Sequence, residues 1–153
     1  MKILDRKGLS GIIQRFVELM LIGGILIILG LPFVLKWYMS LLNGNTTELY
    51  AFLLPFLYVT GILAAIIVFE LRKIFITLNR MDPFRMDNVK SFRIISVCCF
   101  IIAAAYIVKI FTFNSFLTII LFMVFVIVGF MLLVLSEVFR QAVIVKEEND
   151  LTI

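Results

Sequence analysis

The chain has 153 residues, of which 63% are hydrophobic and only 16% are charged, and its mean hydropathy is +1.18. Soluble domains contain about 45–50% apolar and about 25% charged residues, so a chain of this length could not bury so much apolar surface. The composition excludes an ordinary soluble domain and predicts an integral membrane protein. Histidine is absent, and the two cysteines, Cys98 and Cys99, are adjacent, so we expect neither a metal site nor a cofactor.

Four apolar stretches are long enough to cross a bilayer, which takes about 20 helical residues. They cover residues 16–35, 50–69, 92–111 and 116–138. The sequence therefore predicts an all-α, four-transmembrane-helix bundle that forms one membrane domain over residues 1–153, with residues 139–153 as a tail. The first stretch is longer than the apolar part of a cleaved signal peptide, so we expect it to remain as an anchor. Pro32, near its end, is expected to kink or terminate that helix.

The lysines and arginines are distributed unevenly around the predicted spans. Twelve of the fourteen precede the first span, lie between the second and third spans or at the first residues of the third, or follow the fourth. Only Lys36 and Lys109 lie at the opposite ends of the spans. By the positive-inside rule, both termini and the loop at residues 70–91 are expected to face the cytoplasm.

Three carboxylates lie where the predicted spans meet the cytoplasmic interface, and each has a basic residue three positions away. The pairs are Arg15 and Glu18, Glu70 and Lys73, and Glu137 and Arg140. Residues three apart share a helix face, so each pair is expected to form an interfacial ion pair. The alternative is that the three carboxylates converge into a cation or proton site of a small transporter or immunity-type protein. They lie at span ends, however, whereas coupling sites usually lie near the midplane.

The segment between the second and third spans contains a helix-start pattern. Asp82 and Pro83 resemble an N-cap followed by a first helical residue, although Asp87 or Asn88 could equally cap the third span. Phe84 follows as an apolar contact that could lie on the membrane surface. Two roles remain open for this segment: a capped turn with a basic face attracted to anionic lipid, or a surface that binds a partner.

The chain ends "SEVFRQAVIVKEENDLTI", from Ser136 to Ile153. We expect the fourth helix to continue one or two turns beyond the membrane and to stop with Asn149 in the left-handed position. The remaining Asp-Leu-Thr-Ile is predicted to leave as a short β-prone segment. This tail is either a frayed terminus or an acidic surface with an apolar tip that binds a partner.

Two stretches together carry a family resemblance. The "DPF" at 82–84, followed by Asn88 and Arg93, and the ending "EENDLTI" resemble a small bacterial four-span family catalogued as domain of unknown function 2975. Its members typically show a PF-x3-N-x4-R loop and an E-E-x-D-L-T-[IV] tail. Asp82 departs from the Asn, Thr or Gly-Thr that members often have before Pro-Phe. The resemblance covers the chain in length and span number, and it implies a multi-pass protein of the bacterial cytoplasmic membrane.

The resemblance also implies a partner, because members of that family are commonly encoded beside a small helix-turn-helix regulator of the Xre or Cro type. The expected role is a regulatory membrane protein that binds this regulator, with no enzymatic activity and no direct contact with nucleic acid. Homo-oligomerisation remains open. The expected partner-binding residues are Asp82, Pro83, Phe84, Asn88 and Arg93 of the loop, and Glu147, Glu148, Asn149, Asp150, Leu151, Thr152 and Ile153 of the tail.

Overall fold

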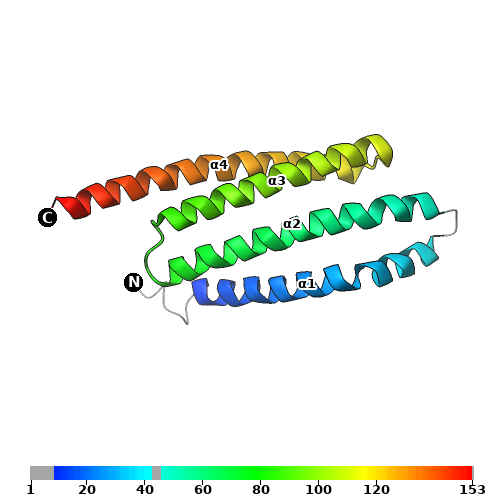
Figure 1. Cartoon of the computed structure of the whole chain (residues 1–153), viewed down its shortest axis with the longest axis horizontal. Coiled ribbons are helices and arrows are strands. Elements are labelled where there is room, and N and C mark those ends of the chain that lie inside the picture. Colours follow the sequence, from blue (N-terminus) through cyan, green and yellow to red (C-terminus); the bar gives the residue numbers. More distant parts are fainter. Residues whose placement is uncertain (1–8, 43–45, 153) are drawn as a thin grey trace.

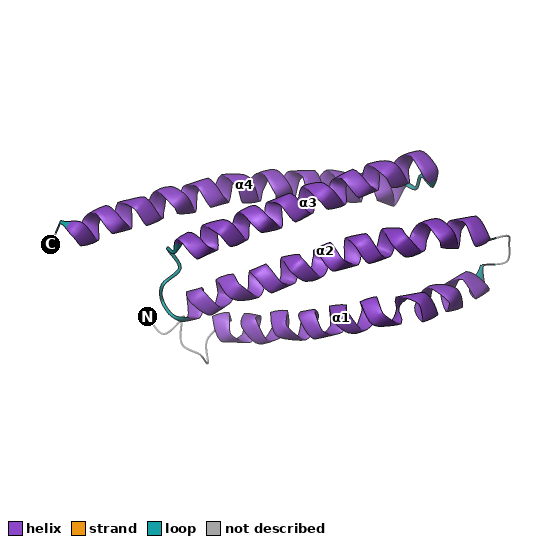
Figure 2. Cartoon of the chain, in the orientation of Figure 1, coloured by secondary structure: helices purple, strands orange, loops and turns teal. Residues whose placement is uncertain are grey.

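The computed structural model describes residues 9–42 and 46–152, and nearly all of them are helical. The helices are α1 (Leu9–Leu41), α2 (Thr47–Asn79), α3 (Met86–Thr112) and α4 (Phe116–Leu151). Figure 2 shows that the described part of the chain contains no strand. Each helix is long and apolar enough to cross a membrane. The predicted all-α architecture with four membrane-spanning helices is therefore confirmed.

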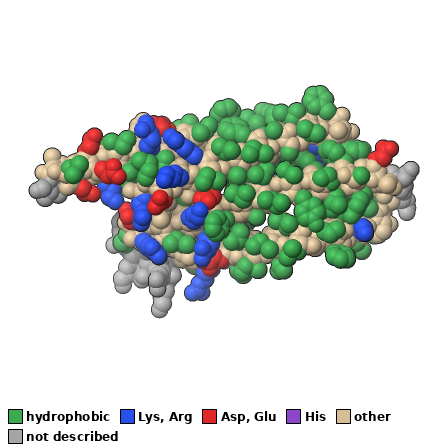
Figure 3. Space-filling model, viewed as in Figure 1, with side chains coloured by type: hydrophobic (Ala, Val, Ile, Leu, Met, Phe, Trp, Pro, Cys, Tyr) green, Lys and Arg blue, Asp and Glu red, His purple; other side chains and the backbone are tan. Residues whose placement is uncertain are grey.

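The helices run alternately in opposite directions, and each packs against its neighbour in the chain (Figure 1). Consequently, the start of α1, the α2–α3 loop and the end of α4 all lie at the same end of the bundle. Most of the charged side chains gather there, whereas hydrophobic side chains cover the rest of the face in Figure 3. We refer to this region as the charged end; it comprises residues 11–18, 70–93 and 137–152.

The tightest contact between helices joins α3 and α4. The Ser96 hydroxyl donates a hydrogen bond to the carbonyl oxygen of Gly129 over 2.8 Å. A Cβ atom at Gly129 would lie only 3.0 Å from the Phe100 ring, so a larger residue at this position would displace that ring. In an apolar solvent, where burial of apolar surface drives little association, such close packing and interhelical hydrogen bonds hold helices together.

All four helices extend beyond the predicted apolar spans. Hydropathy marks the part that lipid can surround, but backbone hydrogen bonding continues into polar residues on either side. Pro32 does not terminate the first helix, which was one of the two outcomes expected for it, because α1 continues to Leu41. Transmembrane helices tolerate proline where neighbouring groups satisfy the freed backbone carbonyl.

The predicted start of the third helix is also wrong. The N-cap residue of α3 is Arg85, in extended conformation, and the helix begins at Met86. Asp82 lies before this start, and its carboxylate contacts Lys146. Asn88 lies inside the first turns and donates its side-chain hydrogen bonds to the preceding loop and α2. Both side chains thus make tertiary contacts instead of capping the helix.

The tail differs most from its prediction. Helix α4 continues thirteen residues past Val138 to Leu151, and Thr152 is its C-cap residue. The predicted left-handed stop at Asn149 is wrong, since Asn149 is helical and Met81 (φ 57°) is the non-glycine residue with positive φ among those described. The Thr152 hydroxyl donates a hydrogen bond to the Glu148 carbonyl oxygen at 2.8 Å and thereby satisfies one of the last carbonyl groups. The predicted β-prone ending is helical up to Leu151, and Ile153 lies outside the described residues.

Candidate functional site

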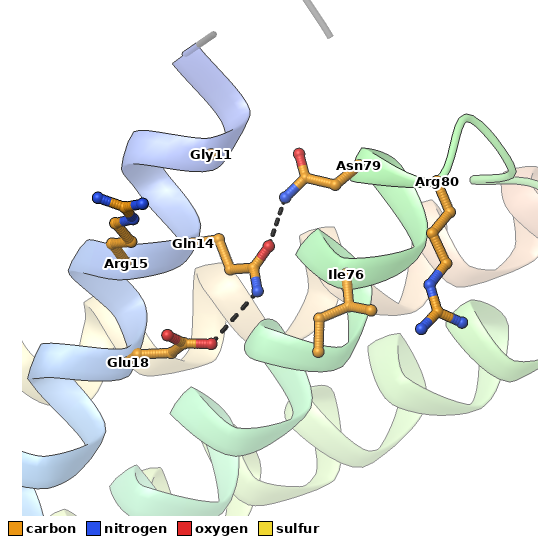
Figure 4. Close-up of a pocket in the computed structure, with 7 residues that line it drawn as sticks. All are labelled: Gly11, Gln14, Arg15, Glu18, Ile76, Asn79 and Arg80. Carbon is orange, nitrogen blue, oxygen red and sulfur yellow. Dashed lines mark hydrogen bonds between the residues drawn. The ribbon is translucent and has the colours of Figure 1, made fainter. Parts of the chain in front are cut away.

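The first carboxylate at the charged end joins α1 to α2. Glu18 contacts the Arg72 side chain on α2 at 3.1 Å rather than the predicted Arg15. Gln14 donates a hydrogen bond to Glu18 at 3.2 Å and accepts one from Asn79. Figure 4 shows this chain of polar side chains crossing a cavity of about 390 Å³, with Arg15 pointing away from Glu18. The Glu18–Arg72 ion pair therefore connects α1 and α2, whereas the spacing predicted a pair of Glu18 with Arg15 within α1.

The second carboxylate is buried between α2 and α3. Glu70 is only 5% exposed. Its carboxylate lies 2.7 Å from the Lys73 ammonium group, as the spacing predicted, and it accepts a second hydrogen bond from the Ser91 hydroxyl at 2.7 Å. Sequence reasoning missed Ser91, because an isolated serine near a span end gives no sign of the carboxylate opposite it. Burial is tolerated because both carboxylate oxygens have a partner.

The third carboxylate ties α4 to α3. Glu137 contacts Arg140 at 2.6 Å, as the spacing predicted, and Arg93 of α3 at 3.7 Å. All three carboxylates therefore link neighbouring helices, each with its own cation. Among the described residues, no group of three or more His, Cys, Asp or Glu side chains could hold a metal ion. The described part of the chain therefore lacks the clustered carboxylates that a single converging cation site would need.

The α2–α3 loop is held in place by Asn88. Its side-chain amide donates to the Pro83 carbonyl oxygen and to the Thr77 hydroxyl oxygen, each at 2.7 Å. Asn88 is also among the most deeply buried side chains, at 1% exposed. Its role is therefore to fix the loop on the end of α2, and it is not presented to a partner. The residues around Asp82, Pro83 and Phe84 acquire a defined shape as a result.

The same loop contacts the helical tail. Lys146 of α4 lies 2.7 Å from Asp82, and the rings of Phe84 and Phe139 pack with their centroids 5.5 Å apart. Phe139, Val143 and Lys146 are spaced by four and three residues, so they share one face of α4. Val143 is buried on that face. The two segments singled out in the sequence therefore form one surface, which we call the loop–tail surface (residues 82–84 and 144–152).

The electrostatics of this contact favour the charged form of the Asp82 side chain. The hydrogen bond from Lys146 lowers the pKa of the Asp82 carboxyl below its ordinary value near 3.8. The positive charges of Lys146 and Arg85 act in the same direction. The contact is thus intact at neutral pH.

The outward face of the tail carries acidic and apolar side chains together. Ile144, Glu147, Glu148 and Leu151 follow the spacing i, i+3, i+4, i+7, which places them on one helix face. All four are exposed, and Leu151 reaches 86% exposure. Lys146 and Asp150 lie on the other side, four residues apart. A partner approaching α4 from outside would meet Glu147 and Glu148, which we call the acidic stripe, and then the apolar side chain of Leu151.

The predicted partner-binding residues differ in how far they are exposed to solvent. The exposed ones are Phe84, Arg93, Glu147, Glu148, Asn149, Asp150, Leu151 and Thr152. Asp82 and Pro83 are half-buried, and Asn88 is buried beneath them. Arg93 lies on α3 beside Glu137 and does not share the outward face of the tail.

Comparison with known proteins identifies a family. The family model described as "Protein of unknown function (DUF2975)" matches residues 33–153, which include the last part of α1, the other three helices and the whole loop–tail surface. No curated protein and no solved structure matches the chain.

Proposed function

This chain belongs to DUF2975, a family of proteins of unknown function, and we propose that it is a regulatory protein of the bacterial cytoplasmic membrane. In this proposal the loop–tail surface faces the cytoplasm and binds a small helix-turn-helix regulator. The membrane-spanning helices hold that regulator at the bilayer and couple its binding to the state of the membrane.

The observation that carries the proposal is the helical tail. Helix α4 continues past its apolar span to Leu151 and presents Glu147, Glu148 and Leu151 on one exposed face. The Asp82–Lys146 contact and the packing of Phe84 on Phe139 fix this tail against the loop. A surface that is ordered before binding avoids much of the conformational entropy that a disordered segment loses on association.

The chemistry of this face suits a basic partner with an apolar groove. Helix-turn-helix domains carry basic surfaces that bind DNA phosphate. Exposed carboxylates such as Glu147 and Glu148 would accelerate the encounter with such a surface, whereas Leu151 would contribute apolar contact that slows dissociation. Binding there would compete with DNA for the same basic surface, which gives a means of regulation.

The transporter alternative has less support. A coupling carboxylate would need to exchange its cation or proton as the protein changes conformation. Glu18, Glu70 and Glu137 instead each contact an arginine or lysine at the charged end of the bundle. No specific observation favours transport over partner binding.

The proposal can be tested with the full chain in detergent and the helix-turn-helix protein encoded beside its gene. Truncation after Lys146 removes the acidic stripe and Leu151 but keeps the contact with Asp82. We expect the dissociation constant to rise at least about 30-fold, as for loss of a central anchor. Helix content should fall only by the few helical residues removed, and elution in detergent should not change, because those residues lie beyond the apolar span.

A charge reversal provides a second measurement. Glu147→Lys combined with Glu148→Lys should weaken binding mainly at low salt, where exposed charges are least screened. The matched control is Glu48→Lys with unchanged tail, since Glu48 lies at the start of α2, at the other end of the bundle. Equal affinity of the truncated and full-length chains would refute the proposed role of the tail.

A further inference from the structure

A cavity with several charged residues in its lining lies between the end of α2 and the start of α3, away from the acidic stripe. It has a volume of about 440 Å³. Its charged lining consists of the cations Lys73, Arg80, Arg85 and Lys90 and the acids Glu70 and Asp87. The cations outnumber the acids by two, so the cavity has an excess of positive charge.

The acids in the cavity are already paired. Glu70 is bound by Lys73 and Ser91, and Asp87 contacts Arg85 at 3.3 Å. Arg80 and Lys90, in contrast, form no ion pair with any residue that the structure describes. The excess charge therefore resides on two exposed side chains that line the same cavity from different helices, Arg80 from the end of α2 and Lys90 from the first turns of α3.

The cavity lies at the level where apolar spans give way to polar residues. Its lining comes from residues 70–80 at the end of α2 and 85–94 at the start of α3, where the apolar stretch 50–69 has ended and the stretch 92–111 begins. Ile76 and Ile94 add an apolar wall. The N-terminus of α3 also lies here, and the positive end of its helix dipole favours an anion. This combination matches a phosphate group attached to an apolar tail, since basic pockets between membrane helices bind anionic headgroups.

We propose that the cavity between α2 and α3 is a binding site for a phosphate group, with Arg80 and Lys90 as its principal ligands. The phosphate would belong to an anionic membrane lipid or to a soluble phosphate compound. The proposal does not depend on the proposed regulator, because the acidic stripe and this cavity carry opposite charge and share no residue.

The test measures equilibrium binding to the full chain in a zwitterionic detergent. The probes are short-chain phosphatidylglycerol, short-chain phosphatidylcholine and inorganic phosphate. Arg80→Gln and Lys90→Gln are measured separately, so that each remains informative if the other variant fails to fold. Lys36→Gln, which removes the same charge from an exposed position at the opposite end of the bundle, is the matched control.

We expect phosphatidylglycerol to bind more tightly than phosphatidylcholine and to lose about fivefold in affinity in each of the two cavity variants. Lys36→Gln should bind like the wild type. If inorganic phosphate binds as tightly as the lipid and suffers the same losses, the site stands and its ligand is a soluble phosphate. If neither cavity variant weakens any probe, or Lys36→Gln weakens them equally, the proposed site is wrong.

Discussion

The two ends of the bundle are held together by different chemistry. At the charged end, a carboxylate joins each helix to the next. Glu18 pairs with Arg72 and Glu137 pairs with Arg93, whereas Glu70 of α2 accepts a hydrogen bond from Ser91 of α3. At the opposite end the contacts are mainly aromatic, as between Phe52 and Phe113 and between Phe56 and Tyr106, with ring centroids 5.3 Å apart in both pairs. Lys109 adds a hydrogen bond to Thr118 there.

The two ends therefore present different chemistry to their surroundings. Aromatic packing requires no water and leaves few polar groups for a partner. The ion pairs of Glu18 and Glu137, in contrast, are partly exposed and keep charged groups within reach of other molecules. The loop–tail surface and the α2–α3 cavity both lie at the charged end, so the two proposed binding sites are at the same end of the bundle.

The largest expected effect concerns the orientation of these ends. After Ile153, a reporter that works only in the cytoplasm should be active and one that works only in the periplasm should be inactive. The reason is that twelve of the fourteen lysines and arginines lie at the end of the bundle that carries this terminus. The matched fusion in the turn at residues 113–115, between α3 and α4, should be active only with a periplasmic reporter. Periplasmic activity of the fusion after Ile153 would contradict the assignment of the charged end to the cytoplasm.

The next effect compares two carboxylates at the charged end. Glu70→Ala should destabilise the bundle by about 1–3 kcal/mol, because it leaves the buried Ser91 hydroxyl without its acceptor. Glu137→Ala should leave stability nearly unchanged, since water can replace the lost contacts of this more exposed pair. Unfolding of both variants by denaturing detergent measures the difference, and equal losses would show that burial of Glu70 is not what distinguishes them.

The smallest effect concerns the contact between loop and tail. The pKa of Asp82 is lowered in the folded protein, so its contact with Lys146 stabilises the fold above pH 3.8 and is lost as the pH falls through the lowered value. A spin label on Asn149→Cys should become more mobile over that range. Adding Asp82→Asn should give the mobile spectrum at pH 7 and remove the pH dependence. A label with equal mobility in both proteins at pH 7 would show that this contact does not hold the tail.

The sequence predicted the membrane fold well because hydropathy over about 20 residues depends on composition alone. It predicted contacts between helices poorly, since those depend on how each helix is rotated about its axis. Glu18 illustrates this: Arg15 is three residues away on the same helix, but Arg72 on α2 provides the contact. Asn88 illustrates it again, because the loop that it holds and its Thr77 partner are fixed by the turn between α2 and α3.

The tail shows a second limit of sequence analysis. Asn149 and the β-prone Leu-Thr-Ile suggested that the helix would stop early. Helix α4 instead continues to Leu151, with Val143 buried, Phe139 packed on Phe84 and Lys146 in contact with Asp82. Tertiary contacts of this kind outweigh the small differences in helix propensity between residues.

The most direct test of the proposed role of the loop–tail surface compares one substitution at each end of the bundle. Leu151→Asp adds a charge to the exposed tip of the tail, and Leu42→Asp makes the same change just beyond α1 at the opposite end. Binding of the proposed helix-turn-helix partner to each full-length variant would be measured by titration in detergent. We predict that Leu151→Asp raises the dissociation constant at least about 30-fold and that Leu42→Asp leaves it unchanged. Equal affinities of the two variants would contradict the claim that the charged end, through the tip of α4, is where the partner binds.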